Sequence, residues 1–280
     1  MGLSRPKPEH EPLKFDRTDI AAAERYFREH GYVIFENAFP VAQGAAFWRD
    51  VDDALAANKP LTFCVWGRYH TYPEVPLEGR RFPRIVDVES HVPSTYALML
   101  SPLIVDFLTA HYSAAPTCLQ TLAYLYSSEQ GAHSDKTLVG PPYALNYDRN
   151  TLVASWLAME DSDESNGALV VYPGSHRFRK RGIDDGFDGD YGRYSAYVDE
   201  LSRANGCMPM IYRARAGEML FWHSDLVHAG GPITAPGETL PTRRSLVCHY
   251  ARIPAHKRSG DPGWERVHIG RASYFAKVGS

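Results

Sequence analysis

Two histidine and aspartate triplets in this 280-residue chain have the spacing of metal ligands. His133 and Asp135 are separated by one residue, and so are His223 and Asp225. On an extended segment, residues i and i+2 point to the same side, so an imidazole nitrogen and a carboxylate oxygen could reach one ion. A third ligand from a distant strand would complete a facial triad of two histidines and one carboxylate, which leaves positions open on iron(II).

The residues that follow favour the first triplet. His228 is available downstream as a third ligand, and Arg243 follows it as an always-charged fork that binds a carboxylate in a bidentate manner. If the second triplet held the metal, His249 would be the only nearby third ligand on a strand, with no convincing anion-binding residue after it. We treat the histidine of the second triplet as a core or supporting residue. The predicted metal ligands are His133, Asp135 and His228.

Two adjacent arginines, Arg243 and Arg244, compete for the role of anion anchor. They begin a predicted strand, and adjacent strand residues face opposite sides, so only one of them can point inward. A pair of solvent-facing arginines at a strand end is the alternative interpretation.

The elements around these residues change character along the chain. Apolar residues at helical spacing predict helices over 18–30, 41–57 and 94–111. A strand is predicted at 32–35, and from Thr117 onward short β-rich runs separated by turns occur at 119–126, 137–139, 152–159, 168–172, 218–222 and 245–250. Helices followed by many short strands predict a β-barrel or sandwich supported by N-terminal helices.

We expect one domain over residues 1–280. Its parts in order are a loose arm at 1–15, helical support at 16–116, a β core at 117–252 with an insertion or lid at 178–210, and a C-terminal extension at 253–280.

Composition excludes several classes of protein. The formal net charge of −3 gives no basic footprint, so we expect no nucleic-acid partner. No secretory signal and no run long enough to cross a membrane is present, and the four cysteines form no CxxC pair. We therefore expect a cytoplasmic protein without a structural zinc site, a disulfide framework or a membrane partner.

Several sequence blocks resemble, in order, the phytanoyl-CoA dioxygenase family of iron(II)- and 2-oxoglutarate-dependent oxygenases, which includes ectoine hydroxylase. The resemblance spans roughly residues 18–252. Its blocks are HSD at 133–135, WLAMED at 156–161, NGAL at 166–169, PGSH at 173–176, GEMLFWH at 217–223, LVHAGGP at 226–232 and RRSLVCHY at 243–250.

The resemblance implies a mostly β protein with flanking helices and a double-stranded β-helix core, a jelly roll similar to cupins. It implies Fe(II) as cofactor, with 2-oxoglutarate and O2 as co-substrates. It places the 2-oxoglutarate carboxylate on Arg243 in preference to Arg244, and implies that His223 does not bind metal. Gln120 and Trp156 align with positions that flank the 2-oxoglutarate pocket, although plain barrel packing would account for both residues equally well.

Two departures from the family concern the co-substrate pocket. Gly230 stands where the family often has a small hydroxyl residue, so one hydrogen bond to 2-oxoglutarate is lost or replaced. The interval between His228 and Arg243 is also longer than usual. The presence of Asp135 argues against halogenation, because the related halogenases lack this carboxylate.

The substrate is expected to be a small molecule contacted by segments 62–92, 136–150 and 178–215. Aromatic and arginine residues in the first segment suit a polar ring-bearing or anionic compound. The candidate substrate residues are Trp66, Arg68, Tyr69 and Tyr194. Hydroxylation in bacterial secondary metabolism by a monomer or homodimer is the favoured interpretation, with desaturation, epimerisation or cyclisation as alternative outcomes.

Two interpretations from other classes stay open at the level of sequence. One is a non-catalytic, cupin-like ligand-binding barrel whose histidines are structural. The other is a cupin-like zinc or manganese enzyme that needs no oxygen.

Overall fold

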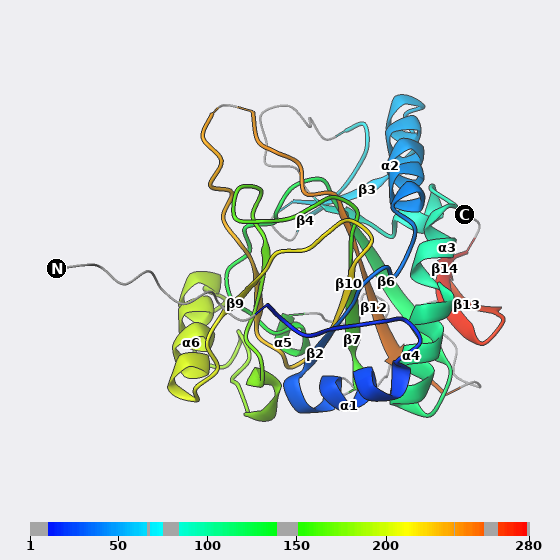
Figure 1. Ribbon diagram of the computed structural model, residues 1–280. Helices are drawn as coiled ribbons and strands as arrows, with labels where there is room; N and C mark the ends of the chain where they lie inside the picture. Colours follow the sequence, from blue (N-terminus) through cyan, green and yellow to red (C-terminus); the bar gives the residue numbers. More distant parts are fainter. Residues whose placement is uncertain are drawn as a thin grey trace.

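One large mixed sheet dominates the computed structural model, which describes residues 11–65, 68–74, 84–138, 151–237, 239–254 and 263–278 (Figure 1). The strand order is β1-β2-β10-β7-β12-β6-β5-β3-β4, and β14 joins β6 and carries β13. The bounds are β1 Lys14–Phe15, β2 Tyr32–Phe35, β3 Thr62–Val65, β4 Arg68–Thr71, β5 Arg84–Val86, β6 Pro116–Tyr124, β7 Val153–Ala158, β10 Met219–His223, β12 Ser245–Arg252, β13 Trp264–Ile269 and β14 Ala272–Lys277.

A small second sheet faces the large one. It has the order β11-β8-β9, with β8 at Leu169–Val171, β9 at Met210–Tyr212 and β11 at His228–Gly230. Buried residues from both sheets, including Trp156, Val247 and Leu169, form one apolar cluster between them. Two packed sheets with helices on the outside make the jelly-roll core, and the predicted fold class is confirmed.

Helices cover the outer face of the large sheet, where α2, α3 and α4 lie together on one side in Figure 1. The bounds are α1 Ile20–His30, α2 Val41–Ala56, α3 Thr95–Met99 and α4 Pro102–Tyr112. Their buried side chains pack in one cluster with the strands, and the ring of Phe107 lies 4.6 Å from that of Phe221 on β10. The helices therefore hold the strands that carry the site without contributing ligands.

The helix predicted over 94–111 is wrong as a single element. Leu100 and Ser101 separate α3 from α4. Pro102 follows at the first position of α4, where its missing N–H costs nothing. The residue before a proline avoids the α region, so one helix cannot run through Ser101.

The strand predicted at 137–139 is also wrong. Thr137 and Leu138 belong to the helical turn α5, Asp135–Leu138, and Val139 lies outside the described residues. A three-residue run is too short for periodicity to separate strand from helix. The turn begins at Asp135 itself, so the backbone changes direction at the predicted ligand.

The segment 178–210 lies between β8 and β9 and contains the helix α6, Tyr191–Ala204. Tyr194 and Val198 of this helix pack with Val227 and Ala132, which flank the predicted ligands. The insertion thus supports the metal-binding loops from outside the sheets. No helix in the described part of the chain is long and apolar enough to span a membrane.

Candidate metal centre

Three buried side chains converge between the two sheets. One ligand atom from each of His133, Asp135 and His228 lies within 4.8 Å of the others, and this is the only such group that the described residues contain. The Nε2 atoms of the two histidines lie 3.9 and 3.6 Å from Oδ1 of Asp135, respectively. Two imidazoles and one carboxylate suit iron(II) with open coordination positions.

Backbone hydrogen bonds fix the two imidazole rings. Nδ1 of His133 lies 2.8 Å from the carbonyl oxygen of Gly131, and Nδ1 of His228 lies 3.1 Å from that of Leu226. A carbonyl can only accept, so each Nδ1 carries the proton. Each Nε2 therefore keeps a free lone pair directed at the metal position.

The two ligand segments also pair with each other. The N–H of His133 donates to the carbonyl of His228 at 3.0 Å, and the reverse bond is 2.9 Å. This antiparallel bridge lies outside the long strands and joins the loop after β6 to β11. The spacing of the two histidines is therefore set by the backbone.

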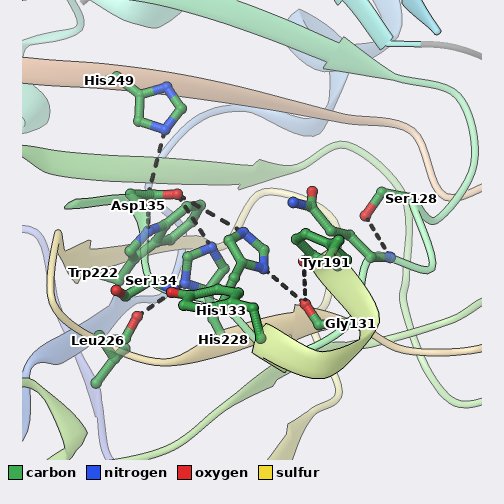
Figure 2. A network of polar contacts seen from close by, with 12 residues as sticks. Ser128, Gly131, His133, Ser134, Asp135, Tyr191, Trp222, Leu226, His228 and His249 are labelled. Atoms are coloured by element: carbon green, nitrogen blue, oxygen red, sulfur yellow. Dashed lines mark hydrogen bonds and ion pairs between the residues drawn. The ribbon is translucent and has the colours of Figure 1, made fainter. Parts of the chain in front are cut away.

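Asp135 is held by two residues on its far side (Figure 2). The indole Nε1 of Trp222 donates to Oδ2 at 2.6 Å, and Nε2 of His249 lies 3.5 Å from the same oxygen. Burial alone would raise the pKa of Asp135, but His228 and His249 outweigh it and lower that pKa. The carboxylate is thus an anion with Oδ1 left for the metal.

The imidazole of His133 is neutral in this setting. Burial, together with the neighbouring His228, lowers the pKa of His133 to about 3. A neutral imidazole is the form that binds metal.

The second triplet lies away from this cluster. His223 accepts a hydrogen bond from the N–H of Asp225 at 3.0 Å and packs near His176. The carboxylate of Asp225 pairs with Lys136 at 2.9 Å. Both polar side chains of the triplet therefore have structural partners.

Arg243 and Arg244 point to opposite environments. Arg243 is 3% exposed, donates from Nη1 to the carbonyl of Gly167 at 2.5 Å, and lies 5.6 Å from the centre of the Trp156 ring. Its Nε has no hydrogen-bond partner. Arg244 instead reaches carboxylates on the helical side, such as Glu160 at 3.6 Å.

A cavity of about 220 Å³ connects the triad with Arg243. Its wall contains Gln120 and Trp156, which face inward because they lie beside His249 and Val247 in the register of β12. Three buried nitrogens in the wall have no partner: Nε1 of Trp156, Nε of Arg243 and Nδ1 of His249. Buried polar atoms are normally satisfied, so this wall is built for a polar ligand.

Ser128 occupies the space left by Gly230. A Cβ placed on Gly230 would lie 2.5 Å from Oγ of Ser128, and both residues line the cavity. The hydroxyl of Ser128, from a different segment of the chain, therefore lies where a hydroxyl side chain at position 230 would otherwise be.

The four candidate substrate residues lie in different environments. Tyr69 lines the cavity mouth and is 61% exposed. Arg68 is exposed on β4 and does not line the cavity. Tyr194 is fully buried, and its hydroxyl accepts from the N–H of Ser134 at 3.4 Å, so it supports the metal loop. Trp66 lies outside the described residues.

Sequence reasoning missed several residues of the site. Trp222 and His249 could have been found from the sequence, because each lies on a predicted strand within a block of the family resemblance, at 217–223 and 243–250. Ser128 gave no such pattern, since the loop after β6 has no distinctive motif. Arg84 lies in the segment 62–92 that was expected to contact the substrate, but it was not singled out there because the strand β5 was not predicted. The residues that the structure adds to the cavity are Arg84, Tyr124, Ser128, Gln130, Trp222 and His249.

Comparison with known proteins agrees with this geometry. Residues 103–240 match the family model for phytanoyl-CoA dioxygenase. The match covers 138 of the 280 residues, just under half of the chain. The peroxisomal phytanoyl-CoA dioxygenase of Bos taurus is 28% identical over 108 residues, and that of Rattus norvegicus is 30% identical over 106 residues. These matches cover 38% and 36% of this chain, and 30% and 28% of the relatives, so the chain matches about a third of their length.

Solved structures share the fold over nearly the whole chain. The 2-oxoglutarate-dependent carbocyclase SnoK from nogalamycin biosynthesis has a TM-score of 0.64 at 16% identity, covering 95% of this chain and 100% of its own. EctD from S. alaskensis has a TM-score of 0.62 at 18% identity, covering 88% and 83%. The jelly roll extends well beyond the segment that the family model matches.

Proposed function

We propose that this protein is an Fe(II)- and 2-oxoglutarate-dependent dioxygenase that oxidises an unactivated C–H bond of a small molecule. The observation that carries the proposal is the shared cavity: the His133, Asp135 and His228 triad and the buried Arg243 face one enclosed space. A metal triad alone is also compatible with a non-catalytic barrel. A buried guanidinium with an unpartnered Nε beside it supports a co-substrate that carries a carboxylate.

The residues present fit both groups. Two imidazoles whose Nδ1–H groups donate to backbone carbonyls, together with one carboxylate, are suitable donors for iron(II). Arg243 fits a carboxylate of 2-oxoglutarate, and its contact with Gly167 leaves other N–H groups available. Among the solved structures with this fold, the epimerase SnoN was obtained with Fe3+ and alpha-ketoglutarate, and EctD with 2-oxoglutarate.

Several residues in and around the cavity then have a defined task. Iron together with 2-oxoglutarate and O2 supplies the oxidising power, with succinate and carbon dioxide as co-products. Arg243 holds the distal carboxylate of the co-substrate, and Trp222 and His249 keep Asp135 in one orientation. The apolar cluster between the sheets excludes water around the reacting carbon.

We favour hydroxylation in bacterial secondary metabolism. SnoK and SnoN, a carbocyclase and an epimerase from nogalamycin biosynthesis, have similar folds, which supports such a setting and keeps other outcomes in view. Product mass separates them, because hydroxylation adds one oxygen atom. Desaturation or cyclisation removes two hydrogens, and epimerisation leaves the mass unchanged. We further propose a cytoplasmic monomer or homodimer without a nucleic-acid or membrane partner.

Anaerobic absorbance spectroscopy tests the cofactor assignment. Addition of Fe(II) and 2-oxoglutarate to the protein should give a weak visible charge-transfer band, which His133→Ala should abolish. His223→Gln is the matched control, because this histidine belongs to the second triplet and should leave the band in place. Absence of the band in the wild-type protein, or its persistence in His133→Ala, would contradict the proposal.

Dependence of turnover on oxygen distinguishes the proposed dioxygenase from a zinc or manganese enzyme with the same fold. The proposed enzyme releases succinate from 2-oxoglutarate only with oxygen and Fe(II). Turnover of a substrate without either one would favour the cupin-like alternative. A screen of small molecules for stimulated succinate release would then identify the substrate.

A further inference from the structure

Arg84 lines the cavity, but the proposed function gives it no ligand. It is the first residue of β5, where Ile85 pairs with Ala123 of β6. This register places Arg84 beside Tyr124, and both side chains line the cavity together with His133. The guanidinium therefore opens on the same cavity as the metal position, and Tyr124 interacts with both Arg84 and Arg243.

The partners of Arg84 within the protein are weak. Nη2 donates to the thiol of Cys64 at 3.5 Å, and the phenol of Tyr124 interacts with the guanidinium. No carboxylate among the described residues lies within ion-pair distance of it. A guanidinium offers five N–H donors in a planar fork, so most of these donors have no strong acceptor in the described structure.

The charges in the cavity leave Arg84 uncompensated. Besides its histidines, the cavity wall carries one carboxylate, Asp135, and two guanidinium groups, Arg243 and Arg84. The charges of iron(II) and of the 2-oxoglutarate dianion would cancel, as do those of Asp135 and Arg243. The positive charge of Arg84 is then left to pair with a further anionic group.

We propose that Arg84 binds a carboxylate of the substrate. This inference rests on the proposed function, because it assigns a substrate subsite to the same cavity. The planar fork matches a carboxylate in a bidentate manner. Tyr69 at the mouth exposes an aromatic surface beside it, which suits the apolar body of an organic acid. The substrate class is therefore a small organic acid with an apolar portion.

Pairs of carboxylic acids and their primary amides provide the test. Indole-3-acetate and indole-3-acetamide, 3-phenylpropanoate and 3-phenylpropanamide, and octanoate and octanamide are titrated anaerobically into the protein loaded with Fe(II) and 2-oxoglutarate. The shift of the visible band reports binding. At least one acid should bind about tenfold or more tightly than its amide, as expected for charge-assisted hydrogen bonds.

Three variants locate this preference. Arg84→Gln should abolish it, and Arg84→Lys should retain part of it, because lysine keeps the charge but lacks the fork. Arg252→Gln is the matched control, since Arg252 is an exposed arginine of the same large sheet. The 2-oxoglutarate affinity should stay unchanged in Arg84→Gln and fall in Arg243→Gln.

The outcomes separate this inference from the proposed function. The inference is overturned if no pair shows a preference for the acid, or if the preference persists in Arg84→Gln. It is also overturned if Arg84→Gln weakens 2-oxoglutarate binding as much as Arg243→Gln does, because Arg84 would then serve the co-substrate. In all three cases the band itself would still support the oxygenase. A wild-type protein without the band would overturn both.

Discussion

Asp135 receives contacts from two sides. Its Oδ1 faces the two histidine ligands, while Oδ2 accepts the indole N–H of Trp222 at 2.6 Å and lies near His249. A carboxylate fixed in this way presents one oxygen to the metal and cannot rotate to offer both. Monodentate binding leaves more coordination positions for co-substrate and oxygen, so these contacts bear on the chemistry as well as on affinity.

Removal of the indole donor should therefore weaken the metal site. Trp222→Phe keeps the ring packed beside His228 but leaves Oδ2 without its shortest contact. We expect about a tenfold loss of Fe(II) affinity, the usual scale for partners of a metal ligand, in a folded protein. Competition with a chromophoric chelator measures the affinity, and circular dichroism checks the fold.

His249 gives a second test of the same carboxylate. In His249→Gln the amide nitrogen can still donate to Asp135, whereas His249→Phe removes the donor from the buried pocket. The glutamine variant should bind Fe(II) more tightly than the phenylalanine variant. Equal affinities in the two variants would mean that His249 acts only through packing.

Ser128 and Gly230 form a complementary pair whose exchange can be tested. Ser128→Ala should weaken 2-oxoglutarate binding about tenfold, because a hydroxyl donor to a charged carboxylate is lost. Gly230→Ser alone should also weaken it, because the new Cβ meets Ser128 Oγ at 2.5 Å. Combining Ser128→Gly with Gly230→Ser should restore binding, measured by titration of the visible band. Unchanged 2-oxoglutarate affinity in Ser128→Ala would show that Ser128 does not act through its hydroxyl.

At the scale of elements, the sequence was informative where a pattern was long or a motif was distinctive. The helices at 20–30 and 41–56 have clear apolar stripes. The strand β7 lies within its predicted run, and β12 begins at the predicted residue and continues two residues further. The break before Pro102 was readable from local rules but was overlooked. The strands β3, β4 and β5 were missed, because each has only three or four residues and they join the sheet through the pairing of β5 with β6, which is distant in sequence.

The site residues, too, were predictable only where they belong to a distinctive sequence motif. The predicted ligands lie in blocks with fixed order, and the structure brings those side chains together. The contribution of Ser128 could not be predicted, since only the folded loop places its hydroxyl beside Gly230. Arg84 was covered only by the broad prediction that segment 62–92 contacts the substrate, because its strand has three residues and nothing in the sequence distinguishes it from the other arginines nearby.

The insertion helix α6 has a testable link to the metal loop. Tyr191 donates its hydroxyl to the carbonyl of Gly131 at 2.7 Å, the same carbonyl that receives Nδ1–H of His133. Tyr191→Phe should loosen this loop and lower Fe(II) affinity several-fold without unfolding the protein. Tyr197→Phe, on the same helix but without a contact to the loop carbonyl, is the control. Equal effects of the two substitutions would indicate a general weakening of α6.

At the scale of the whole molecule, Glu89 makes stability depend on pH. This residue is buried beside β6, where the hydroxyl of Thr121 donates to it, and burial together with repulsion from Asp87 raises the pKa of Glu89 to about 8. The folded state thus favours the protonated acid, whereas the unfolded chain ionises it near its ordinary value of 4.5. The contribution to stability is complete below that value and is lost as the pH rises towards about 8.

Glu89→Gln removes this ionisation. The free energy of unfolding of the variant, measured in urea, should rise relative to that of the wild type by about 3 kcal/mol between pH 5.5 and 8.5. Glu36→Gln, which changes an exposed carboxylate, should follow the wild type over the same range. A constant difference between Glu89→Gln and the wild type across pH would contradict a buried protonated acid.

The backbone bridge between His133 and His228 has a consequence for how the enzyme is loaded. Because the main chain already holds both imidazoles at their spacing, the metal has no folding step to drive. We therefore expect iron to dissociate and rebind while the jelly roll stays folded. The metal-free protein should be stable and able to bind Fe(II) repeatedly. Loss of iron by oxidation or chelation would therefore inactivate the protein reversibly. Addition of fresh Fe(II) should restore activity without a refolding step.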